Sequence, residues 1–251
     1  MRYFIRLSYK GTKFHGWQIQ PNAISIQEVL EKAFSTILQT KTAITGAGRT
    51  DSGVHAKNYI AHFDMDNTLF TSDLDNLIYK LNAILPYEIA IHEIIEVKEN
   101  AHARFDAKSR TYQYFISKYK DAFEYELSWL RYGKLNIDLM NKACEILTTY
   151  NDFTSFAKLH TDNKTNNCDI KSAFWKEDDT NIIFEITADR FLRNMVRSIV
   201  GTMVSVGLER LSLSEFKGII ESKNRNNAGV SAPSNGLFLV NIVYPEELYL
   251  S

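Results

Sequence analysis

Hydrophobic residues recur along the chain with two spacings, one typical of strands and one typical of helices. Positions 2–9 alternate between polar and apolar residues, which predicts a half-buried strand. Ser25 and Glu28 have the spacing of a capping box, and the apolar stripe that follows predicts a helix to about residue 39. The rest of the first half is expected to contain strands at about 41–46, 58–64 and 89–97, and a helix at about 73–85.

The second half repeats nearly the same order of elements. Strands are expected at about 111–118, 170–176, 181–188 and 237–244, and helices at about 137–147, 190–208 and 213–222. The repeated order predicts an α+β protein with two fused subdomains of ferredoxin-like type, 1–105 and 106–251. We expect their mostly antiparallel sheets to join side by side, with helices on one face and a central cleft opposite. Sequence identity between the halves is not evident, so only the order of elements repeats.

Composition narrows the class of protein. The chain has 251 residues, 45% of them hydrophobic, enough for one large core or two ordinary ones. Cys144 and Cys168 are far apart with no nearby Cys/His cluster, so we expect buried thiols rather than a disulfide framework or a zinc site. The polar and charged residues near the N-terminus and the lack of a long apolar run predict a cytoplasmic protein without a membrane partner.

Charge is clustered rather than abundant. The formal net charge is -1, yet five basic residues stand against one acidic residue between Arg104 and Lys120. The aromatic residues interleaved with them are Phe105, Tyr112, Tyr114 and Phe115. Basic groups bind phosphates and aromatic rings stack on unpaired bases, so this segment is typical of an RNA-binding groove. Arg190, Arg193 and Arg197 recur at helical spacing. Charge runs are usually solvated faces, so this pattern alone supports RNA binding only weakly.

The segment 46–55 is the most unusual stretch of the chain, because three glycines surround an arginine and an aspartate. One interpretation is a tight turn, since Gly, Asp and Ser are ordinary turn residues. The other is a loop that a substrate approaches closely. The spacing matches neither a Walker loop nor a dinucleotide-binding fingerprint.

Residues 48–55, Gly-Arg-Thr-Asp-Ser-Gly-Val-His, resemble the signature of the TruA family of tRNA pseudouridine synthases around its catalytic aspartate. Further matches to this family occur in order at Phe14–Gln18, Ser25–Gln27, His102–Phe105, Arg110–Tyr114, Asn151–Phe156, Met195–Gly201 and Gly236–Val240. The departures are Ser52, where the family commonly has alanine, and Leu192–Asn194, where it has other polar triplets. Neither departure removes a residue that the reaction needs.

The resemblance implies an isomerase that converts uridine to pseudouridine at positions 38, 39 and 40 of the tRNA anticodon stem-loop. The reaction breaks the bond between ribose C1′ and uracil N1, turns the base and joins C5 to C1′. It changes no oxidation state, so no cofactor and no metal are expected. The resemblance also implies a homodimer with tRNA as its partner, although no residue pattern here bears on dimerisation.

The roles of the site residues follow from the same resemblance. Asp51 would be the nucleophile, attacking either C1′ or the base, and Arg197 would pair with it and keep it ionised. Tyr112 would stack on uracil and help remove the C5 proton. The expected substrate-binding residues are Arg49, which would displace the target nucleotide or hold phosphate, and Arg104, Arg110, His55 and Tyr112. His55 and His102 are expected to form hydrogen bonds rather than bind metal.

Two other functions compete with this one. The stretch Asp64-x-Asp66-x-Thr68-Leu69 resembles the first motif of haloacid-dehalogenase-like phosphatases, which require Mg²⁺ and a later acidic motif that Asp178–Asp179 fits poorly. A non-catalytic RNA-binding protein would suit the basic aromatic segment but would leave the Asp51 loop unexplained. A DNA-binding protein is disfavoured, since no recognition-helix or zinc-finger pattern occurs.

Overall fold

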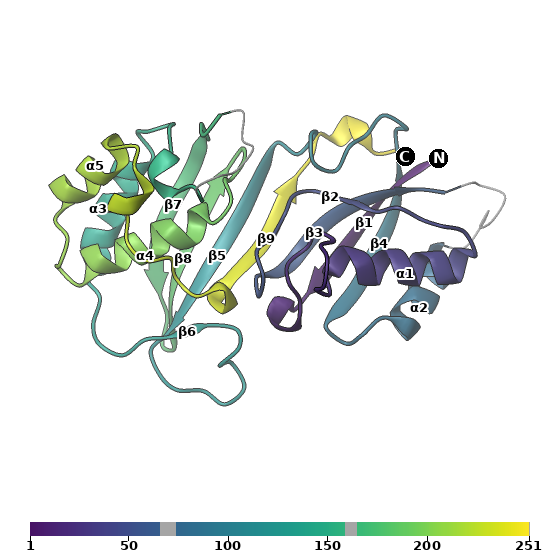
Figure 1. The fold of residues 1–251 in the computed structure, drawn as a ribbon, viewed down its shortest axis with the longest axis horizontal. Helices are drawn as coiled ribbons and strands as arrows, with labels where there is room; N and C mark the ends of the chain where they lie inside the picture. Colours follow the sequence, from purple (N-terminus) through teal and green to yellow (C-terminus); the bar gives the residue numbers. More distant parts are fainter. Residues whose placement is uncertain (66–73, 159–164, 251) are drawn as a thin grey trace. The chain divides into compact units, whose positions relative to one another are not determined.

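The structure is a computed structural model that describes residues 1–65, 74–158 and 165–250 (Figure 1). The chain divides into two compact units, each with its own strands and helices. Unit one consists of Met1–Lys108 and Leu239–Ser251, and unit two of Ser109–Phe238. The α+β class predicted from the sequence is confirmed. The predicted subdomain bounds, 1–105 and 106–251, stay a prediction.

Unit one is built on three long antiparallel strands with two helices on one face. The strands are β1 (Arg2–Tyr9), β3 (His55–Asp64) and β4 (Ile89–Val97), in the order β4-β1-β3, and the short β2 (Thr45–Gly46) pairs with β3. Helices α1 (Ile26–Leu38) and α2 (Leu74–Ile84) lie side by side on these strands (Figure 1). Ser25 begins α1, and its side chain accepts a hydrogen bond from the Glu28 amide at 3.2 Å.

Strand β1 is buried along one face and, at Phe4, on the other face as well. The face of Ile5 and Leu7 is fully buried, as the alternation predicts. On the other face, Phe4 packs against Tyr244 and Tyr249, with ring centroids 5.0 and 6.2 Å away. The C-terminal residues therefore cover a strand from the other end of the sequence.

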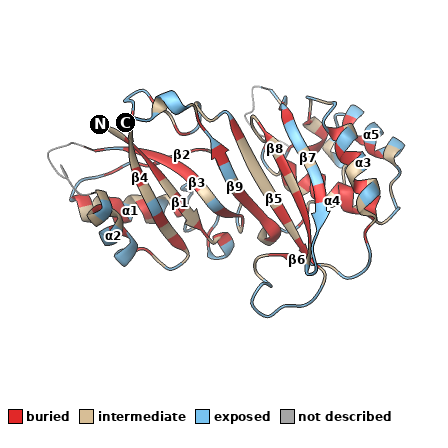
Figure 2. Ribbon diagram, turned by 180° about the vertical axis from the view of Figure 1, so that it is seen from behind, coloured by how far each residue is buried: buried red, intermediate tan, exposed pale blue. Residues whose placement is uncertain are grey.

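Unit two has the same kind of architecture. Its strands β5 (Ser109–Ser117), β8 (Asn181–Ala188) and β7 (Ile170–Glu177) form an antiparallel array in that order, and β6 (Trp129–Leu130) runs parallel to β5. The helices on one face are α3 (Ile137–Leu147), α4 (Met195–Gly207) and α5 (Leu213–Glu221) (Figure 1). Figure 2 shows that β7 is exposed along much of its length, whereas buried residues line β8. Strand β9 (Leu237–Val243) begins in unit two and ends in unit one.

The helix predicted at 190–208 begins five residues later than expected. Asn194 has a φ of +66°, the left-handed conformation that asparagine tolerates better than most residues, and this interrupts the helical backbone before Met195. Arg190 and Arg193 therefore precede the helix, and only Arg197 of that trio lies on it. The prediction of one helical row of three arginines is wrong. Likewise, the strand expected at 41–46 is reduced to Thr45–Gly46.

Both cysteines are free and buried, as predicted from their spacing. Burial raises the pKa of each thiol to about 12, so both are protonated at neutral pH. No helix in the described parts of the chain has the length and apolarity needed to span a membrane.

Candidate active site

The loop that carries Asp51 rests on an aromatic cluster in unit one. Tyr59 of β3 donates its hydroxyl hydrogen to the Gly48 carbonyl, and its hydroxyl oxygen accepts the Gly48 amide at 3.3 Å. Trp17 stacks on Tyr59 with ring centroids 4.2 Å apart, and Tyr9 packs edge-on at 5.5 Å. These rings are almost fully buried. The start of the loop is therefore fixed by side chains from three separate segments.

The segment around Gly16 holds the residue that precedes Asp51. The Trp17 amide donates to the Thr50 carbonyl at 3.3 Å, and the Tyr9 hydroxyl bonds the Thr50 hydroxyl at 3.0 Å. Gly16 has a φ of +85°, and a Cβ atom there would lie 2.3 Å from the Thr50 oxygen. Only glycine fits this close approach without displacing Thr50.

Asp51 itself begins a tight turn. Its carbonyl accepts the Val54 amide at 3.2 Å, and the Gly53 amide donates to the Phe14 carbonyl at 3.3 Å. The Asp51 residue is partly exposed, and the adjacent Arg49 and Ser52 are exposed. Asp51 is thus a partly exposed acidic residue on a backbone that is held from both sides.

His55, at the end of the Asp51 loop, is buried. It is 1% exposed, and its Nδ1 accepts the Gly11 amide at 3.0 Å. A Cβ atom on Gly11 would lie 2.0 Å from the Val54 oxygen, so these two segments pack backbone against backbone. His55 thus anchors the end of the Asp51 loop, while its contact with RNA stays a prediction.

A second loop of unit one presents Arg104 and Phe105 to solvent. The ring of Phe105 is 73% exposed, and the Arg104 guanidinium carbon lies 5.6 Å from its centroid. Nδ1 of His102 accepts the Arg104 amide at 3.1 Å, and Nδ1 of the buried His62 accepts the Ala103 amide at 3.1 Å. The rings of His62 and His102 pack edge to face at 4.8 Å. Two neutral imidazoles therefore hold this loop in place.

Acid is expected to destabilise unit one through His62. Burial, together with the Arg2 charge, lowers the pKa of His62 to about 4, whereas the unfolded chain binds a proton near pH 6.5. Between these values the unfolded state binds more protons, so stability falls as pH drops from 6.5 towards 4, by about 1–3 kcal/mol. Urea unfolding at pH 7 and pH 4.5 measures this loss. His62→Asn keeps an acceptor without titrating and should lose less stability; an equal loss in both proteins would contradict the assignment.

In unit two, the predicted residues lie on β5 and α4. Tyr112 of β5 is half-buried and packs edge to face on Phe191 at 5.0 Å. The Arg110 guanidinium donates to the Asp189 carbonyl at 2.8 Å. Arg197, in the first turn of α4, donates from Nε to the Ala232 carbonyl at 2.8 Å. The predicted residues are thus divided between the units, with Arg49, Asp51, His55 and Arg104 in unit one and Arg110, Tyr112 and Arg197 in unit two.

Comparison with known proteins decides the family. A family model described as tRNA pseudouridine synthase matches residues 143–245. The tRNA pseudouridine synthase A of Parabacteroides distasonis is 52% identical over 248 residues, covering 99% of this chain and 98% of that protein. The enzymes of the same name from Bacteroides fragilis (52% over 249 residues, 99% and 98% covered) and Clostridium acetobutylicum (40% over 242 residues, 96% and 98% covered) are also similar. The chain belongs to the tRNA pseudouridine synthase A family.

As a member of the tRNA pseudouridine synthase A family, the protein is an isomerase that acts on uridine in tRNA. The phosphatase alternative loses its support. Both carboxylate oxygens of Asp64, its proposed nucleophile, accept hydrogen bonds from Nε and Nη2 of Arg2, at 2.8 and 2.9 Å, and Asp178 accepts backbone amides of a turn. Asp66, Thr68 and Leu69 lie outside the described residues. Within the described ranges, His, Cys, Asp and Glu form no group of three or more suited to a metal ion.

The sequence did not predict which residues support the Asp51 loop of this tRNA pseudouridine synthase A family member. The alternation at positions 2–9 predicts a strand that contains Tyr9, but the packing of Trp17, Tyr9 and Tyr59 under Gly48 depends on the tertiary fold. The signal that pointed to them was the match at Phe14–Gln18, which contains Trp17. Tyr114, two residues after Tyr112, is fully buried, and its hydroxyl donates to the Pro233 carbonyl at 2.8 Å. Burial raises the pKa of this tyrosine, so its hydroxyl stays protonated.

Proposed function

We propose that Asp51 is the nucleophile with which this synthase converts uridine to pseudouridine at positions 38, 39 and 40 of the tRNA anticodon stem-loop. The observation that carries the proposal is the preorganised turn at Asp51, fixed through Thr50, Val54 and Gly53 while the residue remains partly exposed. Asp51 is the only acidic residue in segment 46–55. A nucleophile needs a fixed direction of attack, and a backbone held at Thr50, Gly53 and Val54 supports this role.

The reaction needs three further contributions. A cation must keep the carboxylate ionised, and Arg197 is proposed for this role. A flat group must hold the detached uracil while it turns, and the partly exposed ring of Tyr112 is suited to this. As C5 joins C1′, the C5 proton must leave and N1 must gain a proton, and the Tyr112 hydroxyl is proposed to assist this transfer. No step requires a cofactor.

The proposed tRNA contacts are Arg49, Arg104, Arg110 and His55. Arg49 is exposed beside the nucleophile, where a flipped nucleotide would leave its phosphates. Arg104 lies beside the exposed Phe105 ring, a combination suited to a phosphate and a neighbouring base. Action as a homodimer and residence in the cytoplasm are proposed from the resemblance.

Pseudouridine formation in unmodified tRNA transcripts tests this function. Purified protein should modify the transcripts in EDTA, and mapping the product should place it at positions 38, 39 and 40. Modification elsewhere would overturn the proposed sites but not the family. Binding of tRNA without product would favour the RNA-binding alternative, and activity that depends on Mg²⁺ would contradict cofactor-free chemistry.

Phe105→Ala is expected to weaken tRNA binding. Stacking of a base on an aromatic side chain contributes about 1–3 kcal/mol, so the Kd should rise about fivefold to a hundredfold. A filter-binding titration with an anticodon stem-loop measures it. Tyr79→Ala is the matched control, because Tyr79 on α2 is also 73% exposed. Equal effects of the two substitutions would contradict a specific role for Phe105.

A further inference from the structure

Residues 228–232 of unit two lie directly against the backbone of α4. A Cβ atom on Gly201 would lie 1.8 Å from the Val230 oxygen, and one on Gly229 would lie 3.1 Å from Cα of Thr202. The Gly229 amide donates to the Thr202 hydroxyl at 2.9 Å. With no side chain between them, the position of this segment relative to α4 is set by main-chain contact.

This segment orients the Arg197 side chain. The Ala232 amide donates to the Arg197 carbonyl at 2.9 Å, and Nε of Arg197 donates to the Ala232 carbonyl at 2.8 Å. A guanidinium group is planar, with its five N–H groups in a fixed fork. Fixing Nε on one carbonyl therefore fixes where the two amino groups point. A shift of Ala232 would redirect them.

A second arginine, Arg225, forms hydrogen bonds to the same segment. Nη1 of Arg225 donates to the carbonyls of Ala228 and Gly229, at 3.3 and 3.2 Å, and its Nη2 donates to the Ser231 hydroxyl at 3.0 Å. Ser231 also accepts Nδ2 of Asn194 at 2.7 Å. Asn194 is the residue before α4, so this one hydroxyl ties Arg225 to the start of the helix that carries Arg197.

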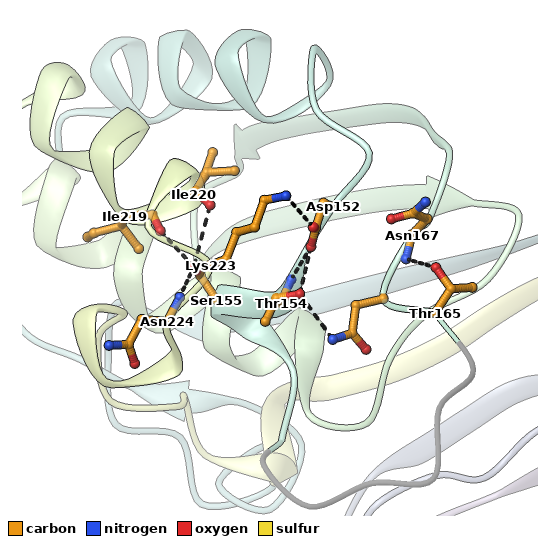
Figure 3. Close-up of polar contacts among 10 residues, drawn as sticks. Asp152, Thr154, Ser155, Thr165, Asn167, Ile219, Ile220, Lys223 and Asn224 are labelled. Carbon is orange, nitrogen blue, oxygen red and sulfur yellow. Dashed lines mark hydrogen bonds and ion pairs between the residues drawn. The ribbon is translucent and has the colours of Figure 1, made fainter.

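The residue before Arg225, Asn224, is held by the buried Ser155 hydroxyl (Figure 3). The amide of the preceding Asn224 donates to the Ser155 hydroxyl at 3.0 Å, and that hydroxyl donates to the Ile219 carbonyl at 2.7 Å. Ser155 is fully buried. Nearby, Lys223 binds Asp152 at 2.9 Å, pointing away from this chain of contacts (Figure 3). The backbone just before Arg225 is therefore held by a buried hydroxyl from another segment, while the Arg225 carbonyl itself accepts the Ala228 amide at 3.3 Å.

We propose that Arg225 is a positioning residue for Arg197, holding residues 228–232 so that the Ala232 carbonyl aims the Arg197 guanidinium for catalysis. The inference rests on the proposed role of Arg197 in the reaction. In this proposal Arg225 acts through Arg197 and not on the substrate itself. Its effect passes through main-chain carbonyls and Ser231, and so it should act on the rate of the chemical step rather than on tRNA affinity.

Single-turnover kinetics at saturating tRNA tests this proposal with Arg225→Gln. The rate constant should fall about tenfold to a hundredfold, since small misplacements of a catalytic group cost rates of that size. The Kd for tRNA should change less than about threefold, because binding contacts are untouched. Arg225→Lys should recover only part of the rate, since an ammonium group cannot serve three acceptors in the same fork. Lys223→Ala, which removes a positive charge two residues away, should keep the wild-type rate.

Distinct outcomes separate this proposal from the one on which it rests. A wild-type rate for Arg225→Gln alongside a severe loss for Arg197→Gln would overturn the positioning role alone. Full activity of Arg197→Gln would overturn the role of Arg197 and the inference with it. A lower melting temperature with an unchanged rate per folded molecule would make Arg225 merely structural. If Arg225→Gln does not fold, Ser231→Ala removes one acceptor, and an unchanged rate there would equally contradict the proposal.

Discussion

Asp51→Asn is expected to abolish pseudouridine formation while tRNA binding persists. The amide has nearly the shape of the carboxylate but is not nucleophilic, so the backbone turn at Val54 and Gly53 should remain intact. Removing a nucleophile typically costs at least about 10³-fold in rate. The rate is measured by single-turnover release of the C5 proton from labelled tRNA, and binding by titration with the same tRNA.

Ser52→Ala is the matched control for this substitution. Ser52 is the next residue, is exposed, and its hydroxyl makes a 3.3 Å bond to the Phe14 carbonyl. Loss of this bond should cost little, and the rate should stay within about threefold of the original. A substantial residual rate in Asp51→Asn, or an equal loss in Ser52→Ala, would show that the carboxylate is not the nucleophile.

Gly16→Ala is expected to impair both the stability of unit one and the reaction. The left-handed φ of +85° costs a non-glycine residue about 1–3 kcal/mol, and the new Cβ would lie 2.3 Å from the Thr50 carbonyl oxygen. Thr50 would have to move, and Asp51 with it. We expect at least a tenfold loss of single-turnover rate in the fraction that remains folded, together with a lower midpoint of urea unfolding.

Gly48→Ala provides the comparison within the same loop. A Cβ atom at Gly48 would meet no atom within 4 Å, and its φ is not in the left-handed range. This variant should keep nearly full activity and stability. If Gly16→Ala behaved in the same way, the fixed position of Thr50 would have no bearing on catalysis.

The elements of this fold could be predicted where one spacing of apolar residues dominated. The ranges of α3 and β8, for example, agree with the structure at both ends. The start of α4 could not be predicted, because the helical spacing of residues extends back to Arg190. Only the left-handed backbone at Asn194 delays the helix until Met195. The burial of Phe4 was also out of reach, since the rings that cover it come from the end of the chain.

The candidate site shows the same limit. Residues 48–55 identified the Asp51 loop through family resemblance, because the pattern of glycines alone is equally consistent with an ordinary turn. Arg225 was not found, since two main-chain carbonyls and the Ser231 hydroxyl, its partners, form no recognisable pattern in the sequence. The burial of His55 against Gly11 could not be predicted either, since the residues around it do not show which segment packs there.

The C-terminal residues complete the unit that the N-terminal residues begin. The Tyr244 hydroxyl donates to the Ala103 carbonyl, the Lys108 amide donates to the Val243 carbonyl at 2.8 Å, and the Lys98 amide donates to the Leu248 carbonyl at 2.9 Å. During translation, unit one therefore cannot be completed until unit two has been synthesised, because the end of β9 and the residues after it follow unit two in the sequence. Unit one should become protease-resistant only after residues 239–250 have been synthesised. Truncation after residue 238 should destabilise unit one and, with it, the Asp51 loop.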